Sequence, residues 1–348
     1  MMKTFDFPKF YLVNNNYNAD FAPAMNEGFQ KYAQEFKRLN RIADSSGDKV
    51  KIRILSIDNQ RDFNFPSGSL YVSGRSGQGA MDAQRNFVEF IYRYLGSITD
   101  IISTLDTHFL YQIFFPPCHI DEQGEFPAPH TIISSDDYKS GKYRANPDIA
   151  EELKLNPKAL QKQFIYYMEQ LENTGKYQLM IWPYHCLLGS IGHALSGVIE
   201  EAIRFHSLVR GSLNRFEIKG SSPYTEHYSI FSPEVKTFFE GTPLPGCGTN
   251  TSLIKTLISS DVVIIVGEAS SHCVKESIQD FLANIKSQDE ELLKKVYIMK
   301  DCMAPVVIPG IADFTDEAEK AFSQFESEGM HVVDSTTPIE DWPDIKLG

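Results

Sequence analysis

The run Asp261–Gly267 (DVVIIVG) constrains the fold of this chain more than any other feature, because a strand formed by it would be apolar on both faces. Such a strand needs cover on both sides, as in a parallel sheet with helices above and below. Other β-rich apolar runs alternate with helical periodicity, the pattern of parallel strands joined by crossover helices. The sequence therefore predicts an α/β fold of three layers (α/β/α) around a mostly parallel sheet of about six strands. The strands are expected at Lys51–Asp58, Asp100–Asp106, Tyr177–Ile181, Asn214–Lys219, Asp261–Gly267 and Lys295–Lys300.

The chain suits one large domain with two additions, since its 348 residues are 42% hydrophobic and can bury a substantial core. We assign residues 49–348 to this domain. Residues 1–48 form an N-terminal extension with a predicted helix near Asn26–Leu39, and we expect it to be a cover or an oligomer contact. Residues 115–176 form an insert with a Pro-rich start and a predicted helix near Pro157–Glu172, typical of a lid or an interface. Further helices are predicted near Met81–Tyr94, Leu187–Phe205, Cys273–Ile285 and Asp316–Glu326.

Composition excludes several classes of protein. The formal net charge of −13, without a cluster of Lys and Arg, argues against nucleic acid as a partner. Neither a signal peptide nor a run of membrane-spanning length is found, so we expect a soluble cytoplasmic protein. The 5 cysteines are widely spaced and contain no CxxC pair, which predicts reduced thiols rather than disulfides or a thiolate zinc site.

Chemically reactive side chains follow five of the predicted strands, at the edge where open parallel sheets bind their ligands. Each has an ordinary alternative: a turn-forming aspartate, a solvated strand-end lysine or an inert buried cysteine. Their conjunction at one edge is the evidence for an active site. The residues are Asp58, Asp106 with His108, His185, Lys219 and Cys273.

Cys273 is the predicted nucleophile. It lies where the strand Asp261–Gly267 turns into a helix, so free N–H groups and the positive helix end are expected to lower the pKa of its thiol. Turn N–H groups around Ala269 and Cys273 are suited to hold a developing oxyanion. Asp58 is the predicted proton acceptor, provided that desolvation raises the pKa of its carboxyl. Lys219 is the neighbouring cation.

Asp106 and His108 are two positions apart, so they share a face if the strand continues. With His185 they offer one carboxylate and two imidazoles, which suit zinc or another divalent ion. The other histidines have no comparable support, and we expect most of them on the surface or in loops. They are His119, His130, His193, His206, His227, His272 and His331.

Five blocks of the sequence, in order from about residue 51 to 334, resemble the nicotinamidase/isochorismatase-like cysteine hydrolase superfamily, and its nicotinamidase branch most closely. The resemblance implies the isochorismatase-like hydrolase fold for residues 49–348. The blocks are Asp58–Phe63 (DNQRDF) followed by Gly68–Val72 (GSLYV), Asp106–His108 (DTH), Trp182–Cys186 (WPYHC), Lys219–Phe231 (KGSSPYTEHYSIF) and Gly267–Val274 (GEASSHCV).

The resemblance also implies roles for individual residues. It implies a cis peptide bond between Glu268 and Ala269, with the N–H groups of Ala269 and Cys273 as the oxyanion hole. Phe63 and Trp182 match the aromatic clamp around the substrate ring, and Tyr228 is a further substrate contact. The implied catalytic triad is Cys273, Asp58 and Lys219, and the implied ligands of zinc or a similar ion are Asp106, His108 and His185.

Some positions depart from the family pattern. Gln112 and Phe114 stand where another metal-binding histidine is often found, so the fourth ligand stays open. Glu226 and His227 replace an Asp-Ser pair, and Glu268 places a charge where an apolar residue is common. These differences, with the long insert, leave room for a substrate pocket unlike that of compact nicotinamidases.

The function implied is metal-assisted hydrolysis of an amide through a thioester on Cys273. Nicotinamide, converted to nicotinic acid and ammonia, is the best single substrate. A different or larger amide or carbamoyl substrate is an alternative, and a non-catalytic binding protein on this fold is a third hypothesis. The expected partners are a small-molecule amide and, in a homo-oligomer, further copies of the chain, without nucleic acid or membrane.

Overall fold

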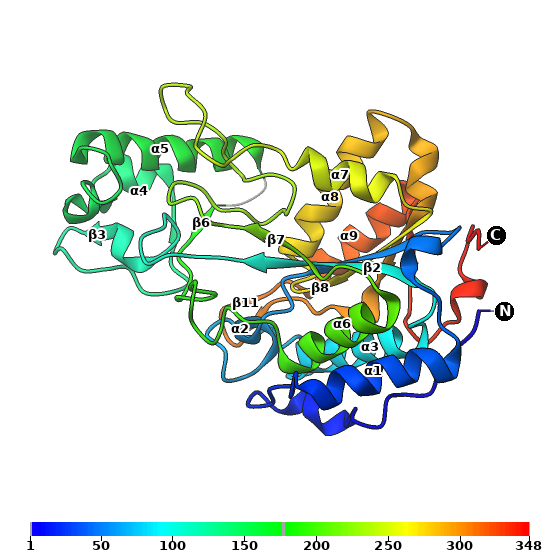
Figure 1. The fold of residues 1–348 in the computed structure, drawn as a ribbon. Helices are drawn as coiled ribbons and strands as arrows, with labels where there is room; N and C mark the ends of the chain where they lie inside the picture. Colours follow the sequence, from blue (N-terminus) through cyan, green and yellow to red (C-terminus); the bar gives the residue numbers. More distant parts are fainter. Residues whose placement is uncertain (1, 176–177, 348) are drawn as a thin grey trace.

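A central parallel sheet organises the computed structural model, which describes residues 2–175 and 178–347 (Figure 1). Its six strands have the order β12-β9-β8-β1-β2-β7, and every neighbouring pair is parallel. The predicted α/β class with a parallel sheet of about six strands is confirmed. The strands are β1 (Ile52–Ile57), β2 (Ile98–Asp106), β7 (Arg215–Lys219), β8 (Val262–Gly267), β9 (Val296–Met299) and β12 (His331–Val333).

Helices cover both faces of this sheet and complete the three layers (Figure 1). One face carries α1 (Glu27–Asn40), α3 (Gly79–Arg93) and α6 (Gly197–Arg210), and the other carries α7 (Thr251–Ile258), α8 (Cys273–Lys286) and α9 (Thr315–Ser327). Successive residues of β8 enter two different apolar clusters: Ile264 packs with residues of α3 and α6, and Ile265 with residues of α7, α8 and α9. This double burial is the reason for the continuous apolar run.

One predicted strand lies outside the central sheet. Tyr177 falls outside the described residues, and the rest of that segment forms only β6 (Leu179–Met180), which pairs antiparallel with β4 (Ile132–Ile133) of the insert. The sixth strand of the sheet is β12 instead, parallel to β9. The prediction was wrong because a short apolar run does not specify which strand it pairs with.

The helix predicted over Leu187–Phe205 begins only at Gly197. The preceding residues form a loop that bridges back to the sheet, through Leu187 beside His108 and Leu195 beside Gln60. Apolar periodicity in this loop therefore reflects its contacts at the carboxyl ends of the strands rather than a helix. Further short elements include α2 (Arg61–Asn64), β10 (Val307–Ile308) and β11 (Ala312–Asp313).

The N-terminal segment packs on the outside of α6. Rings of Phe10, Phe29 and Phe36 surround Phe205 of α6, with ring centroids 5.0 to 5.8 Å apart. These residues belong to the same apolar cluster as α3 and α6. Residues before position 48 therefore belong to the hydrophobic core on this face of the sheet.

The insert lies beyond the carboxyl end of β2 (Figure 1). It builds an apolar cluster of its own. Leu160 and Phe164 are fully buried in it, and Tyr224 and Leu244 from a later segment complete it. The elements of the insert are β3 (His119–Asp121), α4 (Ser135–Lys139), β5 (Tyr143–Ala145) and α5 (Pro157–Thr174), with β3 antiparallel to β5.

None of the helices in residues 2–175 and 178–347 combines the length and the apolar character that a membrane span requires.

Two isoleucines of the same sheet test this arrangement. Ile264 is fully buried in β8, whereas Ile218 on the edge strand β7 is 63% exposed. We expect Ile264→Ala to lower the free energy of unfolding by about 2–5 kcal/mol, because it leaves a cavity in a packed core. Ile218→Ala should change it by less than about 0.5 kcal/mol. Equal losses in urea denaturation would contradict the central position of β8.

Candidate active site

The predicted site residues meet at the carboxyl ends of β1, β2, β7 and β8, although His185 follows β6, which lies outside this sheet. Strand register brings them together: Asp106 pairs with Lys219, and Ile57, which precedes Asp58, pairs with Gly267. A cavity lies at this edge of the sheet, between the strand ends and the loops above them. Its lining includes Phe63, Asp106, His108, Trp182, His185, Lys219, Tyr228, Ala269 and Cys273.

Lys219 is the centre of the group. Its Nζ lies 2.9 Å from Asp58 Oδ2 and 2.9 Å from Asp106 Oδ1, and it donates to Cys273 Sγ at 3.5 Å. All four side chains are buried. Burial by itself lowers the pKa of a lysine, but the carboxylates of Asp106 and Asp58 raise the pKa of Lys219 well above its ordinary value. Lys219 is therefore a permanent cation between the two acids.

Asp58 follows β1 in a sharp turn. Its φ of 47° lies in the left-handed region, and its N–H donates to Thr104 Oγ1 at 3.0 Å, while the Thr104 hydroxyl donates to the Asp58 carboxylate. Burial raises the pKa of Asp58, although the charge of Lys219 acts in the opposite direction. This raised pKa is the property that the sequence analysis required of a proton acceptor.

Cys273 is the first residue of α8, as the sequence predicted, but its thiol differs from the expected one. Burial raises the pKa of Cys273 well above its ordinary value, and the nearby Lys219 charge only partly offsets this effect. The predicted lowering by the helix end is therefore wrong for the resting site, because desolvation of the thiolate outweighs it. A buried thiol of this kind depends on a neighbouring base for its activation.

The turn before α8 presents two backbone donors. The peptide bond between Glu268 and Ala269 is cis, and the Ala269 carbonyl accepts hydrogen bonds from the N–H groups of His272 and Val274. Within the described part of the chain no hydrogen bond engages the N–H groups of Ala269 or Cys273. Both groups are thus available at the cavity for an oxygen of a ligand.

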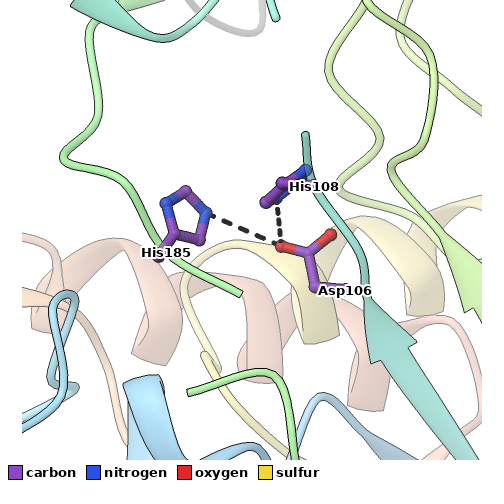
Figure 2. A group of neighbouring side chains, drawn as sticks. All are labelled: Asp106, His108 and His185. Carbon is purple, nitrogen blue, oxygen red and sulfur yellow. Dashed lines mark hydrogen bonds and ion pairs between the residues drawn. The ribbon is translucent and has the colours of Figure 1, made fainter. Parts of the chain in front are cut away.

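Asp106, His108 and His185 form the candidate metal group (Figure 2). His108 Nε2 lies 2.8 Å and His185 Nε2 3.7 Å from Asp106 Oδ2, and the three ligand atoms lie within 4.8 Å of one another. The Nδ1 atoms of both rings donate to backbone carbonyls, those of Gly220 at 3.1 Å and Pro183 at 2.8 Å. These hydrogen bonds fix the tautomers that leave both Nε2 atoms free to bind a metal. The donor set fits zinc or a similar divalent ion.

Gln112 and Phe114, the two positions where another metal-binding histidine is often found, supply no further ligand. Gln112 links two loops by hydrogen bonds. Its amide NH2 donates to the carbonyls of Gly220 at 2.6 Å and Ser222 at 2.8 Å, and its amide oxygen accepts from the N–H of Phe109. The ring of Phe114 packs against His108 with centroids 4.9 Å apart. A metal with three protein ligands keeps positions for water or substrate.

The three predicted substrate contacts all reach the cavity. Phe63 packs against His185 with ring centroids 5.7 Å apart. Trp182 and Tyr228 line another part of the wall, and each ring lies 5.8 Å from that of His272. The cavity therefore has aromatic surfaces next to both the metal group and the nucleophile.

Several residues of the wall were not predicted from the sequence; among them, Glu226, His227 and His272 also line the cavity. The first two were visible only as departures from the family pattern. His272 directly precedes the predicted nucleophile, and this position was the signal that could have identified it.

The expectation that most remaining histidines lie on the surface or in loops was wrong for two of them. His119 in β3 and His206 in α6 are buried within regular elements. His119 bonds the carbonyl of Ile113, and His206 Nε2 lies 2.9 Å from the carbonyl of Ile98. A neutral imidazole with a backbone partner is readily buried, and composition does not reveal such a partner.

Comparison with known proteins supports the fold. No family model matches the sequence, and no curated protein matches it. The structure of yeast nicotinamidase superposes with a TM-score of 0.50 at 18% identity, over 81% of this chain and 99% of that chain. The same yeast enzyme bound to the inhibitor nicotinaldehyde gives a TM-score of 0.50 at 17% identity, over 81% and 99%. A nicotinamidase/pyrazinamidase from Acinetobacter baumanii gives 0.48 at 18% identity, over 82% and 97%.

The likeness to the yeast structures shows that this chain has the fold of the nicotinamidases. This is the fold that the sequence resemblance implied, and its extent, nearly the whole of the yeast chain, confirms that resemblance at the level of architecture.

Gly220 tests how the metal group is packed. Its φ is +86°, and a Cβ there would lie 2.6 Å from Asp106 Oδ1 and 2.8 Å from His108 Cε1. We expect Gly220→Ala to weaken zinc binding by about 10- to 100-fold, because it displaces two ligands. Gly241→Ala is the matched control, since Gly241 has a φ of +85° and nothing within 4 Å of its Cβ. Equal zinc affinities in competition titrations would contradict this metal group.

Proposed function

We propose that this protein is a cysteine-dependent, metal-assisted amidohydrolase, with nicotinamide as its best single substrate. The observation that carries the proposal is the position of the Lys219 ammonium, in contact with Asp58, Asp106 and the sulfur of Cys273. This contact joins a nucleophile and its base to a carboxylate of the metal group. The fold shared with yeast nicotinamidase supports the same conclusion.

Acylation begins with proton transfer from the thiol of Cys273 to Asp58. The sulfur attacks the amide carbon, and the N–H groups of Ala269 and Cys273 stabilise the negative charge that develops on the carbonyl oxygen. When this tetrahedral species collapses, the C–N bond breaks and the amide nitrogen takes the proton from Asp58. Ammonia leaves, and the acyl group remains on Cys273 as a thioester.

Deacylation uses the same groups in the reverse order. Water attacks the thioester carbon as Asp58 accepts a proton from it. The C–S bond then breaks, Cys273 recovers a proton, and the carboxylic acid is released. Throughout both steps the charge of Lys219 offsets the negative charge of Asp58 and of the thiolate.

Asp106, His108 and His185 would hold a divalent ion, which when bound supplies a positive charge that orients the substrate. The aromatic residues Phe63, Trp182 and Tyr228 would contact the ring of the substrate. In nicotinamide this ring is planar and small, which suits a cavity enclosed by aromatic side chains.

The size of the cavity favours a small substrate over a larger amide. The space in the cavity that is open to the centres of water molecules is about 50 Å³. At roughly 10–15 Å³ for each water, this is room for on the order of four waters. A larger amide or carbamoyl compound, the second candidate, would require the side chains that line the cavity to move. A non-catalytic binding protein is disfavoured because nucleophile, base and cation are all in contact distance.

Ammonia release tests the proposal directly. We expect the zinc-loaded protein to release ammonia from nicotinamide, and Cys273→Ala to lower kcat/KM at least about a thousandfold, because the thioester cannot form. Cys247→Ala is the control, since Cys247 is also a buried free thiol but lies in the apolar cluster of the insert. Failure to release ammonia from nicotinamide or any related carboxamide would refute the substrate, and activity in Cys273→Ala would refute the mechanism.

The pH profile tests the base. Because burial raises the pKa of Asp58, kcat/KM should fall on the acid side through a pKa above the usual aspartate value of about 3.9, as the base becomes protonated. Lys219→Met should move this limb to higher pH, since it removes the charge that lowers the pKa of Asp58.

The same profile at higher zinc concentration is the control for this prediction. A limb caused by protonation of His108 or His185 would move to lower pH as zinc is raised, because zinc competes with protons for these nitrogens. A limb caused by Asp58 would stay where it is. A zinc-dependent limb would therefore exclude Asp58 as the group that is titrated.

A further inference from the structure

A buried carboxylate, that of Glu226, lies in the wall of the cavity and is surrounded by aromatic side chains. It accepts three hydrogen bonds from aromatic side chains: from Tyr167 Oη at 2.8 Å, from Trp182 Nε1 at 3.1 Å and from Tyr228 Oη at 2.6 Å. Glu226 is 3% exposed, and no lysine or arginine of the described residues forms an ion pair with it. A carboxylate buried without a cation is stable only if hydrogen bonds replace its hydration, so these three donors are held tightly around it.

Two of the three donors belong to the cavity wall. Trp182 also donates to the Tyr228 hydroxyl at 3.2 Å, so the two rings and the carboxylate form one closed group. Both rings pack on His272, which directly precedes Cys273. Glu226 thereby determines how the wall is oriented relative to the nucleophile.

The third donor comes from the insert. Tyr167 lies on α5 and is fully buried, and its hydroxyl also accepts a hydrogen bond from the backbone N–H of Glu226 at 3.2 Å. The phenol thus holds both the side chain and the main chain of Glu226. Through this pair of contacts, α5 supports the cavity wall from behind.

We infer that Glu226 is a positioning residue, held by Tyr167 of the insert, that orients Trp182 and Tyr228 to receive the planar ring of the substrate. The inference rests on the proposed function for the identity of the ring-bearing amide. It assigns the insert a role as the support of the binding wall. Neither Glu226 nor Tyr167 takes part in proton transfer, so their loss affects binding of the ring more than the chemical step.

Adjacent tyrosines of α5 provide a matched test. Tyr167→Phe should raise the KM for nicotinamide by about tenfold, the effect of about 1.4 kcal/mol from one hydrogen bond to a charged group, with kcat within about threefold. Tyr166→Phe is the control, because it also removes one hydrogen bond, to Thr237 at 2.7 Å, but this bond does not involve Glu226. It should leave KM and kcat unchanged. Equal effects of the two variants on KM would overturn the inference.

Substitutions of the carboxylate separate charge from shape. Glu226→Gln should raise KM more than Tyr167→Phe, because the amide nitrogen would face donors that need an acceptor. Glu226→Asp retains the carboxylate on a shorter side chain and should fall between Glu226→Gln and the unmodified protein. If Glu226→Gln lowered kcat at unchanged KM, Glu226 would act in the chemical step and the inference would fail.

A binding measurement keeps this test separate from the proposed function. Trp182 and Trp342 are the only tryptophans of the sequence. In full-length protein with the substitutions Cys273→Ala and Trp342→Phe, tryptophan fluorescence therefore comes from Trp182 of the wall alone. Adding Tyr167→Phe should shift the emission and weaken nicotinamide binding about tenfold, whereas adding Tyr166→Phe should do neither. Unchanged emission and affinity with Tyr167→Phe would overturn the inference. Absence of turnover in the unmodified protein would refute the proposed function but leave this result valid.

Discussion

The structure of the site depends on the Lys219 ammonium, which lies between two buried carboxylates. Removing one partner from such a group leaves an uncompensated charge at a cost of about 3–5 kcal/mol, so each member requires the others. Asp58 without Lys219 would be protonated by its burial, and a protonated carboxyl cannot accept the proton of the thiol. Asp106 is the second contact of the same ammonium and also the shared partner of the two metal-group histidines. The charge of Lys219 therefore stabilises the ionised forms of both Asp58, next to the nucleophile, and Asp106, in the metal group.

This arrangement is possible because the strands place charged residues side by side at their ends. The register of β2 with β7 aligns Asp106 with Lys219, and two glycines allow the close approach that follows. A Cβ at Gly267 would lie 1.9 Å from the carbonyl oxygen of Ile57, and one at Gly220 would overlap the metal group. Backbone packing thus fixes the distances between catalytic groups before any side chain is considered.

Much of this could be predicted from the sequence, because the sheet and the site are encoded locally. The apolar run of β8 required cover on both faces, and reactive residues directly after buried strands had to meet at one edge. The exchange of Tyr177–Ile181 for β12 could not be predicted, since the pairing of a short strand is decided by distant residues. The direction of the Cys273 pKa shift was missed for a similar reason: the helix end is visible in sequence, but the burial that outweighs it is not.

Glu226 shows why two departures from the family pattern belong together. The family resemblance implies an aspartate where this chain has Glu226, and it also implies a shorter segment where this chain has the insert that carries Tyr167. The additional methylene lengthens the reach of the carboxylate, which here contacts Tyr167 on one side and both Trp182 and Tyr228 on the other. An aspartate is one methylene shorter and would reach less far toward these three donors, and without α5 a glutamate would leave one oxygen buried without a partner, at a cost of about 1–3 kcal/mol. The longer side chain and the insert are thus parts of one solution to the orientation of the binding wall.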